Sequence, residues 1–92
     1  MTTTYEIYLT INNETKTQMF YTANGFKPNC YDAMVFKTLA KAKNHYFDIN
    51  KKFLKQDGFN INVTVCLEKL TVCDESGDVS YKNINKKTIK LT

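Results

Sequence analysis

The ten residues 59–68, FNINVTVCLE, decide the fold that this sequence predicts. Every second position is apolar, and these positions are Phe59, Ile61, Val63, Val65 and Leu67. Alternation of this kind is typical of a β-strand that buries one face and exposes the other. The pattern changes phase afterwards, because Leu70 and Val72 are even-numbered, and a β-bulge near Lys69 would explain the change.

A first hairpin is expected before this strand. Residues 5–11 alternate in the same way, and the polar, turn-like residues 12–15 follow them. Residues 16–23 then return as a second strand, whose inner side chains are expected to be Met19, Tyr21 and Ala23. With this alternation, Phe20 lies on the face of the strand that points away from the core. The opposite phase stays open, because Phe20 is as apolar as Met19.

A second hairpin is expected at the end of the chain. Residues 74–78 are rich in Asp, Ser and Gly and form its loop. Residues 79–85 return as a fourth strand. Residues 86–91 are either the continuation of that strand or a short fifth strand.

The segment between the two hairpins predicts one long amphipathic helix. From Cys30 to about Gln56 there is no Gly and no Pro. Apolar residues recur at steps of four and three, and they are Val35, Leu39, Ala42, Tyr46, Ile49 and Phe53. An unbroken helix of this length would span about 40 Å. Asn29 suits its N-cap and Gly58 its end, while the polar residues within 44–50 would allow a kink.

These elements predict an α+β fold in the order strand, strand, helix, strand, strand. Residues 1–92 are expected to form a single domain, with a four- to five-stranded antiparallel sheet and the helix packed across one face. The order of the strands within the sheet stays open, since two hairpins can join in more than one way. The second face of the sheet would be uncovered and would carry Tyr8 and Phe20.

The composition limits the classes of partner. The 92 residues include 13 lysines and no arginine, with a formal net charge of +4 and a pI near 9.0. Segments 29–58 and 79–92 are basic, whereas segment 59–78 is acidic. Anions must therefore be recognised by lysines, backbone N–H groups or amide side chains. Neither a signal peptide nor a membrane-length apolar run is seen, so we expect a cytoplasmic chain with reduced thiols and no membrane partner.

No group of residues has the pattern of a catalytic or metal site. Cys30 at the start of the predicted helix could be an activated thiol, but His45 lies about four turns along the same helix, roughly 22 Å away. Cys66 and Cys73 lack the spacing of a zinc site, and the loop 74–78 lacks the ligand order of a calcium-binding loop. The sequence therefore predicts a protein that is not an enzyme and that binds no cofactor or metal.

Lysines follow one face of the predicted helix. Those that fall within about 100° of a helical wheel are Lys37, Lys41, Lys51, Lys52 and Lys55. A second cluster in the last strand consists of Lys82, Lys86, Lys87 and Lys90. The ordinary interpretation is a solvated surface. The alternative function is a small nucleic-acid-binding module, in which the helical lysines contact phosphates.

The favoured function is a non-enzymatic interaction protein that blocks a surface of a host protein or nucleoprotein complex. Small chains with arginine-free composition and no chemical site are common among accessory proteins of phages and mobile elements, inhibitors of CRISPR effectors included. The residues expected to bind the partner are Tyr8, Phe20, Asp74, Glu75 and Asp78. A second alternative is a homo-oligomeric structural protein, with a homodimer formed through the uncovered sheet face.

Overall fold

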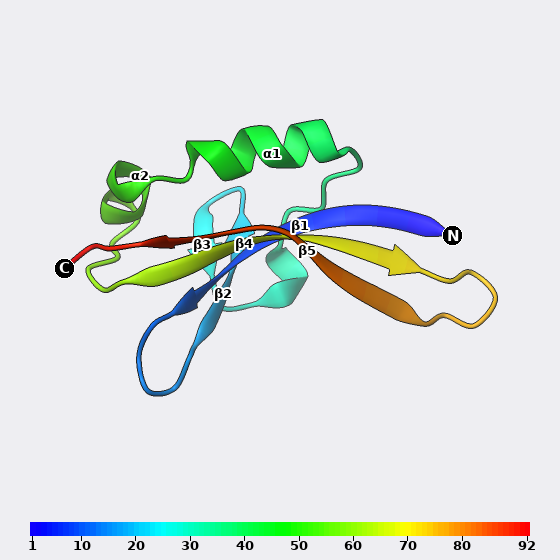
Figure 1. The fold of residues 1–92 in the computed structure, drawn as a ribbon, viewed down its shortest axis with the longest axis horizontal. Coiled ribbons are helices and arrows are strands. Elements are labelled where there is room, and N and C mark those ends of the chain that lie inside the picture. The colour runs from blue at the N-terminus through cyan, green and yellow to red at the C-terminus, as the bar shows by residue number, and fades with distance from the viewer.

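Five antiparallel strands and two short helices build the protein (Figure 1). In this computed structural model, which describes all residues from Met1 to Thr92, the strands lie in the order β3-β2-β1-β4-β5. Their bounds are β1 Thr2–Ile11, β2 Gln18–Thr22, β3 Gly25–Lys27, β4 Val63–Val72 and β5 Val79–Ile89. The predicted α+β class with a five-stranded antiparallel sheet is confirmed.

The order of elements along the chain differs from the predicted strand, strand, helix, strand, strand, because the short strand β3 follows β2 before any helix. Gly25 opens β3 with a φ of 89°, a conformation that favours glycine. The Asp57 carboxylate accepts a hydrogen bond of 2.9 Å from the backbone N–H of Phe26 and so fixes this strand. The fifth strand is therefore β3, whereas residues 86–89 continue β5.

The prediction of one long helix from Cys30 to about Gln56 is wrong. The chain instead forms a 3-10 turn at Cys30–Asp32 (η1), α1 at Leu39–Asp48 and α2 at Lys51–Gln56. Before α1, Phe36 forms an isolated β-bridge with Tyr5, in which each backbone N–H donates to the other carbonyl at 2.9 Å. This bridge holds the segment before α1 extended, so α1 has only ten residues.

Capping side chains determine where the helical segment breaks. Asn29 caps only η1, through a 3.0 Å hydrogen bond from the backbone N–H of Tyr31. Thr38 caps α1 and Asn50 caps α2, through bonds of 3.3 and 2.9 Å from backbone N–H groups. Because Asn and Thr side chains bind nearby backbone groups, they compete with a continuous helix. The apolar stripe is thus divided among separate elements.

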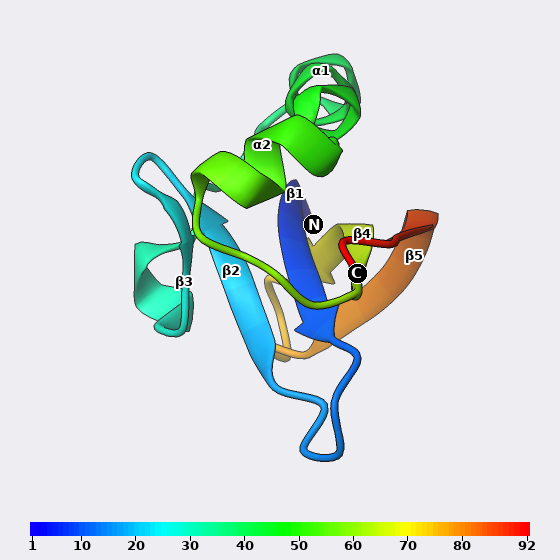
Figure 2. The same ribbon diagram turned by 90° about the vertical axis from the view of Figure 1, so that its left-hand side faces the viewer.

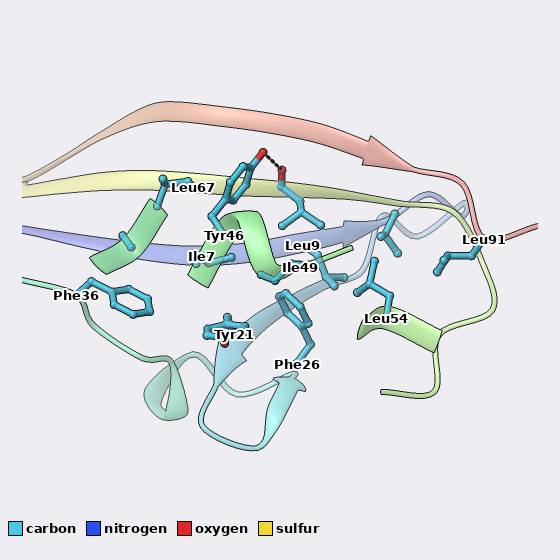
Figure 3. Close-up of a cluster of buried hydrophobic side chains, with 13 residues drawn as sticks. Ile7, Leu9, Tyr21, Phe26, Phe36, Tyr46, Ile49, Leu54, Leu67 and Leu91 are labelled. Atoms are coloured by element: carbon cyan, nitrogen blue, oxygen red, sulfur yellow. Dashed lines mark hydrogen bonds between the residues drawn. The ribbon is translucent and has the colours of Figure 1, made fainter. Parts of the chain in front are cut away.

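Both helices lie over the same face of the sheet, which we call the inner face (Figure 2). The core between these layers contains thirteen buried side chains (Figure 3). Its largest fully buried members include Tyr46, Ile7, Leu9, Ile49, Leu54 and Leu67. Lys87 of β5 joins the two layers, because its Nζ donates to the carbonyl oxygen of Tyr46 at 2.8 Å and lies 4.3 Å from the centre of the Tyr46 ring.

The first two strands have the predicted phase, although β2 ends at Thr22 and Ala23 is exposed rather than on the inner face. Ile7 and Leu9 are fully buried on the inner face, and Tyr21 packs beside them. Tyr8 and Phe20 are opposite partners in the pairing of β1 with β2. They lie on the other side of the sheet, which we call the outer face. The prediction that Phe20 lies outside the core is confirmed.

The predicted bulge near Lys69 of β4 is wrong, because the extra residue lies in β5. The register between β4 and β5 shifts just before Glu68, and Ile84 of β5 is the residue without a partner. β4 itself pairs with β1 without interruption and keeps its alternation to the end. Leu70 and Val72 therefore lie on the outer face.

Candidate functional site on the outer face

The outer face carries an open groove of about 530 Å³. Strands β1, β2, β4 and β5 contribute to its lining, together with Cys30 of η1. We call it the outer groove, and its main lining residues are Glu6, Tyr8, Phe20, Glu68, Leu70 and Tyr81. Neither helix covers it, because α1 and α2 lie over the inner face (Figure 2).

Aromatic and apolar side chains form much of the groove. Tyr8 and Phe20 are opposite neighbours on β1 and β2, and Leu70 and Tyr81 are opposite neighbours on β4 and β5. Tyr81 keeps 65% of its surface exposed to solvent. Partly exposed tyrosine and phenylalanine side chains are enriched where proteins bind one another. The aromatic part of the groove therefore resembles the composition of interaction surfaces.

Two glutamates face each other across β1 and β4. Glu6 and Glu68 are opposite partners in the ladder, so both side chains lie on the outer face. Burial raises the pKa of Glu6, and the negative charge of Glu68 raises this pKa further. Burial also raises the pKa of Glu68, while hydrogen bonding to Tyr8 lowers it in part. Like charges opposite each other in a sheet are destabilising, so this pair opposes folding.

No cation of the chain compensates this glutamate pair. Lys69 follows Glu68 in the sequence, but it lies on the inner face because neighbouring residues in a strand alternate. Lys27 and Lys86 occupy outer-face positions on β3 and β5, and neither forms an ion pair. The single ion pair of the structure lies at the β4–β5 hairpin. The outer groove thus presents unpaired negative charge.

Tyr8 supplies a hydroxyl donor in the groove. Burial raises the pKa of Tyr8 far above its ordinary value, and the neighbouring Cys66 and Glu68 raise it further. The phenol therefore stays protonated at physiological pH. It can donate a hydrogen bond, but it cannot act there as a phenolate base or nucleophile.

The structure brings together only part of the predicted partner-binding set. Tyr8 and Phe20 are adjacent in the outer groove. Asp74, Glu75 and Asp78 lie exposed in the β4–β5 hairpin loop, about 26 Å from the level of Tyr8, which pairs with Cys66, at 3.3 Å per residue along β4. Asp74 binds the Met1 amino group at 2.7 Å. The acidic loop therefore does not form one site with Tyr8 and Phe20.

Sequence reasoning missed four residues of the groove. Leu70 was expected inside, because a bulge in β4 was predicted. Tyr81 lies on a strand whose phase the sequence leaves unassigned. The opposition of Glu6 and Glu68 depends on the pairing of β1 with β4, and the sequence leaves the strand order open. Extending the alternation of residues 59–67 unchanged to residue 72, despite the apolar Leu70, would have placed Leu70 beside Glu68 on the outer face.

The predicted lysine face is divided by the break between the helices. Lys37 precedes α1 and Lys41 lies in its first turn, at the end of α1 that is farther from α2 (Figure 1). Lys51, Lys52 and Lys55 belong to α2 and line a surface hollow of about 550 Å³. The lysines of β5 are divided as well: Lys86 lies on the outer face, whereas Lys87 contacts Tyr46 on the inner face. The expectation of one continuous helical face is wrong.

The single histidine belongs to an aromatic cluster on the inner side. The Nδ1 atom of His45 lies 2.9 Å from the Tyr21 hydroxyl, and its ring centre lies 5.0 Å from that of Phe36. Cys30 belongs to η1 and not to the helix that carries His45, so the predicted arrangement of the two on one helix is wrong. No three His, Cys, Asp or Glu side chains are grouped as metal ligands would be.

Comparison of the chain with protein families, curated proteins and solved structures gave no match. Neither helix has the length and apolar character that crossing a membrane requires. The chemistry of the outer groove is therefore the basis on which a function can be assigned.

Proposed function

We propose that this chain is a non-enzymatic interaction protein that binds a partner protein through the outer groove. The observation that carries the proposal is an uncovered sheet face that combines aromatic walls with an uncompensated glutamate pair. A volume of about 530 Å³ is sufficient to seat several side chains of a partner segment.

The rigidity of the groove supports this proposal. Its main lining residues project from strands of one continuous sheet, and a core of thirteen buried residues supports those strands from the inner side. A site whose geometry is fixed before binding loses less conformational entropy when the partner arrives. The glutamate pair adds specificity, because charge complementarity selects among partners that would fit the aromatic walls equally well.

The mode of action we propose is occupation of a partner's surface. A chain of 92 residues can block a site on a larger assembly without chemistry of its own. We extend the proposal to an inhibitory accessory protein of a phage or mobile element, which would act in the host cytoplasm on a defence or nucleic-acid-processing complex. Inhibition of a CRISPR effector is one case of this kind.

The test compares two exposed aromatic residues on opposite sides of the molecule. Tyr81 in the groove is 65% exposed, and Phe47 on α1 is 60% exposed. Immobilised wild type, Tyr81→Ser and Phe47→Ser are incubated with nuclease-treated bacterial lysate, and the bound proteins are quantified by mass spectrometry. A partner of the groove is retained by wild type and by Phe47→Ser and falls at least about tenfold with Tyr81→Ser. Equal retention by all three variants contradicts the proposal.

A second candidate function is nucleic-acid binding at α2. The observation that favours it is the grouping of Lys51, Lys52 and Lys55 around one surface hollow. Three phosphate contacts would give a salt dependence with a slope of about −2.7 on duplex DNA. Replacing all three lysines by Glu should then abolish binding of a labelled duplex at low salt. Affinity that is unchanged in this variant contradicts the second candidate.

A further inference from the structure

The negative charges of Glu6 and Glu68 in the outer groove have no cationic partner within the chain. Glu6 and Glu68 share one face on adjacent strands, whose opposite Cα atoms lie about 5 Å apart, so one cation can contact both carboxylates. No lysine of the chain forms an ion pair with either of them. Part of the desolvation of these carboxylates has already taken place in the folded chain, because both are partly buried. An arriving cation therefore gains Coulomb energy at a smaller additional desolvation cost.

The walls of the groove fit the rest of a basic side chain. Lysine and arginine carry long apolar stems below a charged group, and these stems pack well on aromatic surfaces. Tyr8, Phe20 and Tyr81 supply such surfaces beside the glutamates. Aromatic faces also attract cations directly. A neutral apolar side chain would use the walls but would leave the two carboxylates uncompensated.

From this combination we propose that the outer groove receives a lysine or arginine side chain of a partner protein segment and holds its charge between Glu6 and Glu68. This inference rests on the proposed function and names the chemistry of the partner at that site. The Tyr8 hydroxyl keeps its proton and favours the charged form of the neighbouring Glu68, whose pKa it lowers, while the aromatic walls enclose the aliphatic stem.

Charge and coordination distinguish this occupant from two others. A calcium or magnesium ion requires about six oxygen ligands, whereas the groove offers two carboxylates and no third acidic group beside them. A second copy of the chain could offer lysine, but two chains that each carry a net charge of +4 repel each other. A basic segment of another protein therefore matches the site best.

The first experiment measures the preference of the groove with short peptides. The probes are acetylated and amidated Gly-Ala-Arg-Ala-Gly, the matching Lys peptide and the matching Gln peptide, each titrated into the ¹⁵N-labelled chain. We expect amide shifts at Tyr8, Phe20 and Glu68 with the Arg or Lys peptide. The apparent affinity should exceed that of the Gln peptide by at least about tenfold. The preference should weaken as salt screens the charges.

Two matched variants make the result specific. The double variant Glu6→Gln with Glu68→Gln removes two charges from the groove with little change in shape. The control Glu14→Gln with Asp48→Asn removes two exposed charges elsewhere. The preference for the basic peptide should disappear in the first variant and persist in the control. Equal affinities for the Arg and Gln peptides overturn the proposal, as does saturation of the same amides by Mg²⁺ without any response to the basic peptides.

A second experiment separates this inference from the proposed function. The captured partner is tested against Tyr81→Ser and against the groove double variant. Loss of binding with both supports the inference. Loss with Tyr81→Ser alone leaves the groove as the binding surface and overturns the basic side chain as its occupant. Retention by both variants overturns the proposed function itself.

Discussion

The two faces of the sheet are built from the same strands and follow opposite rules. On the inner face, Ile7, Leu9 and Leu67 have no exposed surface. One position away along the same strands, the outer face holds Tyr8 and the opposed glutamates. The inner face is arranged for packing, whereas the outer face keeps a like-charge pair that packing alone would not select. Proteins retain such destabilising groups mainly where they serve binding or catalysis, so the outer face is the place to test for function.

Shortening one leucine on each face should give the largest difference in the free energy of unfolding between the two faces. Leu9→Ala removes a fully buried side chain and should lower the free energy of unfolding by about 2–5 kcal/mol. Leu70→Ala on the outer face should lower it by about 1 kcal/mol or less. Urea denaturation followed by circular dichroism measures both. Equal losses would mean that the outer face is packed as a second core.

Two neighbouring lysines of β5, one on each face of the sheet, allow the same comparison for a polar contact. Lys87→Met removes the hydrogen bond to the Tyr46 carbonyl while keeping an apolar chain, and should lower the free energy of unfolding by about 1 kcal/mol. Lys86→Met on the outer face should change it by less than about 0.5 kcal/mol. The comparison uses chemical denaturation at neutral pH. If Lys86→Met is the more harmful change, the assignment of the two faces of β5 is wrong.

The glutamate pair should respond in the opposite direction. At pH 7, Glu6→Gln should raise the free energy of unfolding by about 0.5 kcal/mol, because it removes the like-charge contact with Glu68. Burial raises the pKa of both carboxyls, so the folded chain takes up protons before the unfolded chain does. Wild-type stability should therefore rise as the pH falls from neutral toward about 4.3, and the advantage of Glu6→Gln should vanish there. An advantage that grows on acidification would contradict this account.

The smallest expected effect concerns Tyr81. Since 65% of its surface is exposed, Tyr81→Ser should change the free energy of unfolding by less than about 0.5 kcal/mol. Phe47→Ser, at 60% exposure on the other side of the molecule, should behave alike. Thermal unfolding of the three proteins in parallel measures this. A large destabilisation by Tyr81→Ser would place Tyr81 among the structural residues rather than the binding ones.

The sequence predicted the strands well because the period of two is a local signal. The alternation around Ile7 and Val65 identified their strands without any knowledge of the partners. The prediction of one long helix was wrong because contacts that are not local decide where the helices begin and end. The apolar steps from Leu39 onward were correct, whereas Val35 lies before α1 and is exposed. The caps at Thr38 and Asn50 and the bridge between Tyr5 and Phe36 compete with helix propagation. That bridge joins residues far apart in the sequence, so no local pattern contains it.

The candidate site was predicted in part for the same reason. Tyr8 follows from the alternation of residues 5–11, whereas the phase of the second strand stayed open, and only the structure places Phe20 opposite Tyr8. Glu6 and Glu68 are 62 positions apart, and their opposition arises only when β1 pairs with β4. Like charges opposite each other in a sheet are also disfavoured. Pairing the strands by such preferences would therefore not have placed Glu6 opposite Glu68.

The two edges of the sheet determine how this protein avoids pairing with copies of itself. β3 offers an edge of only three residues, from Gly25 to Lys27. β5 offers eleven, but the register shift at Ile84 divides that edge into two shorter pieces, and lysines lie on both sides of the shift. A strand added to β5 would lose its register halfway along, so templated growth into fibrils is discouraged. The molecule can thus keep one sheet face permanently open to a partner without offering its edges to further copies of the chain.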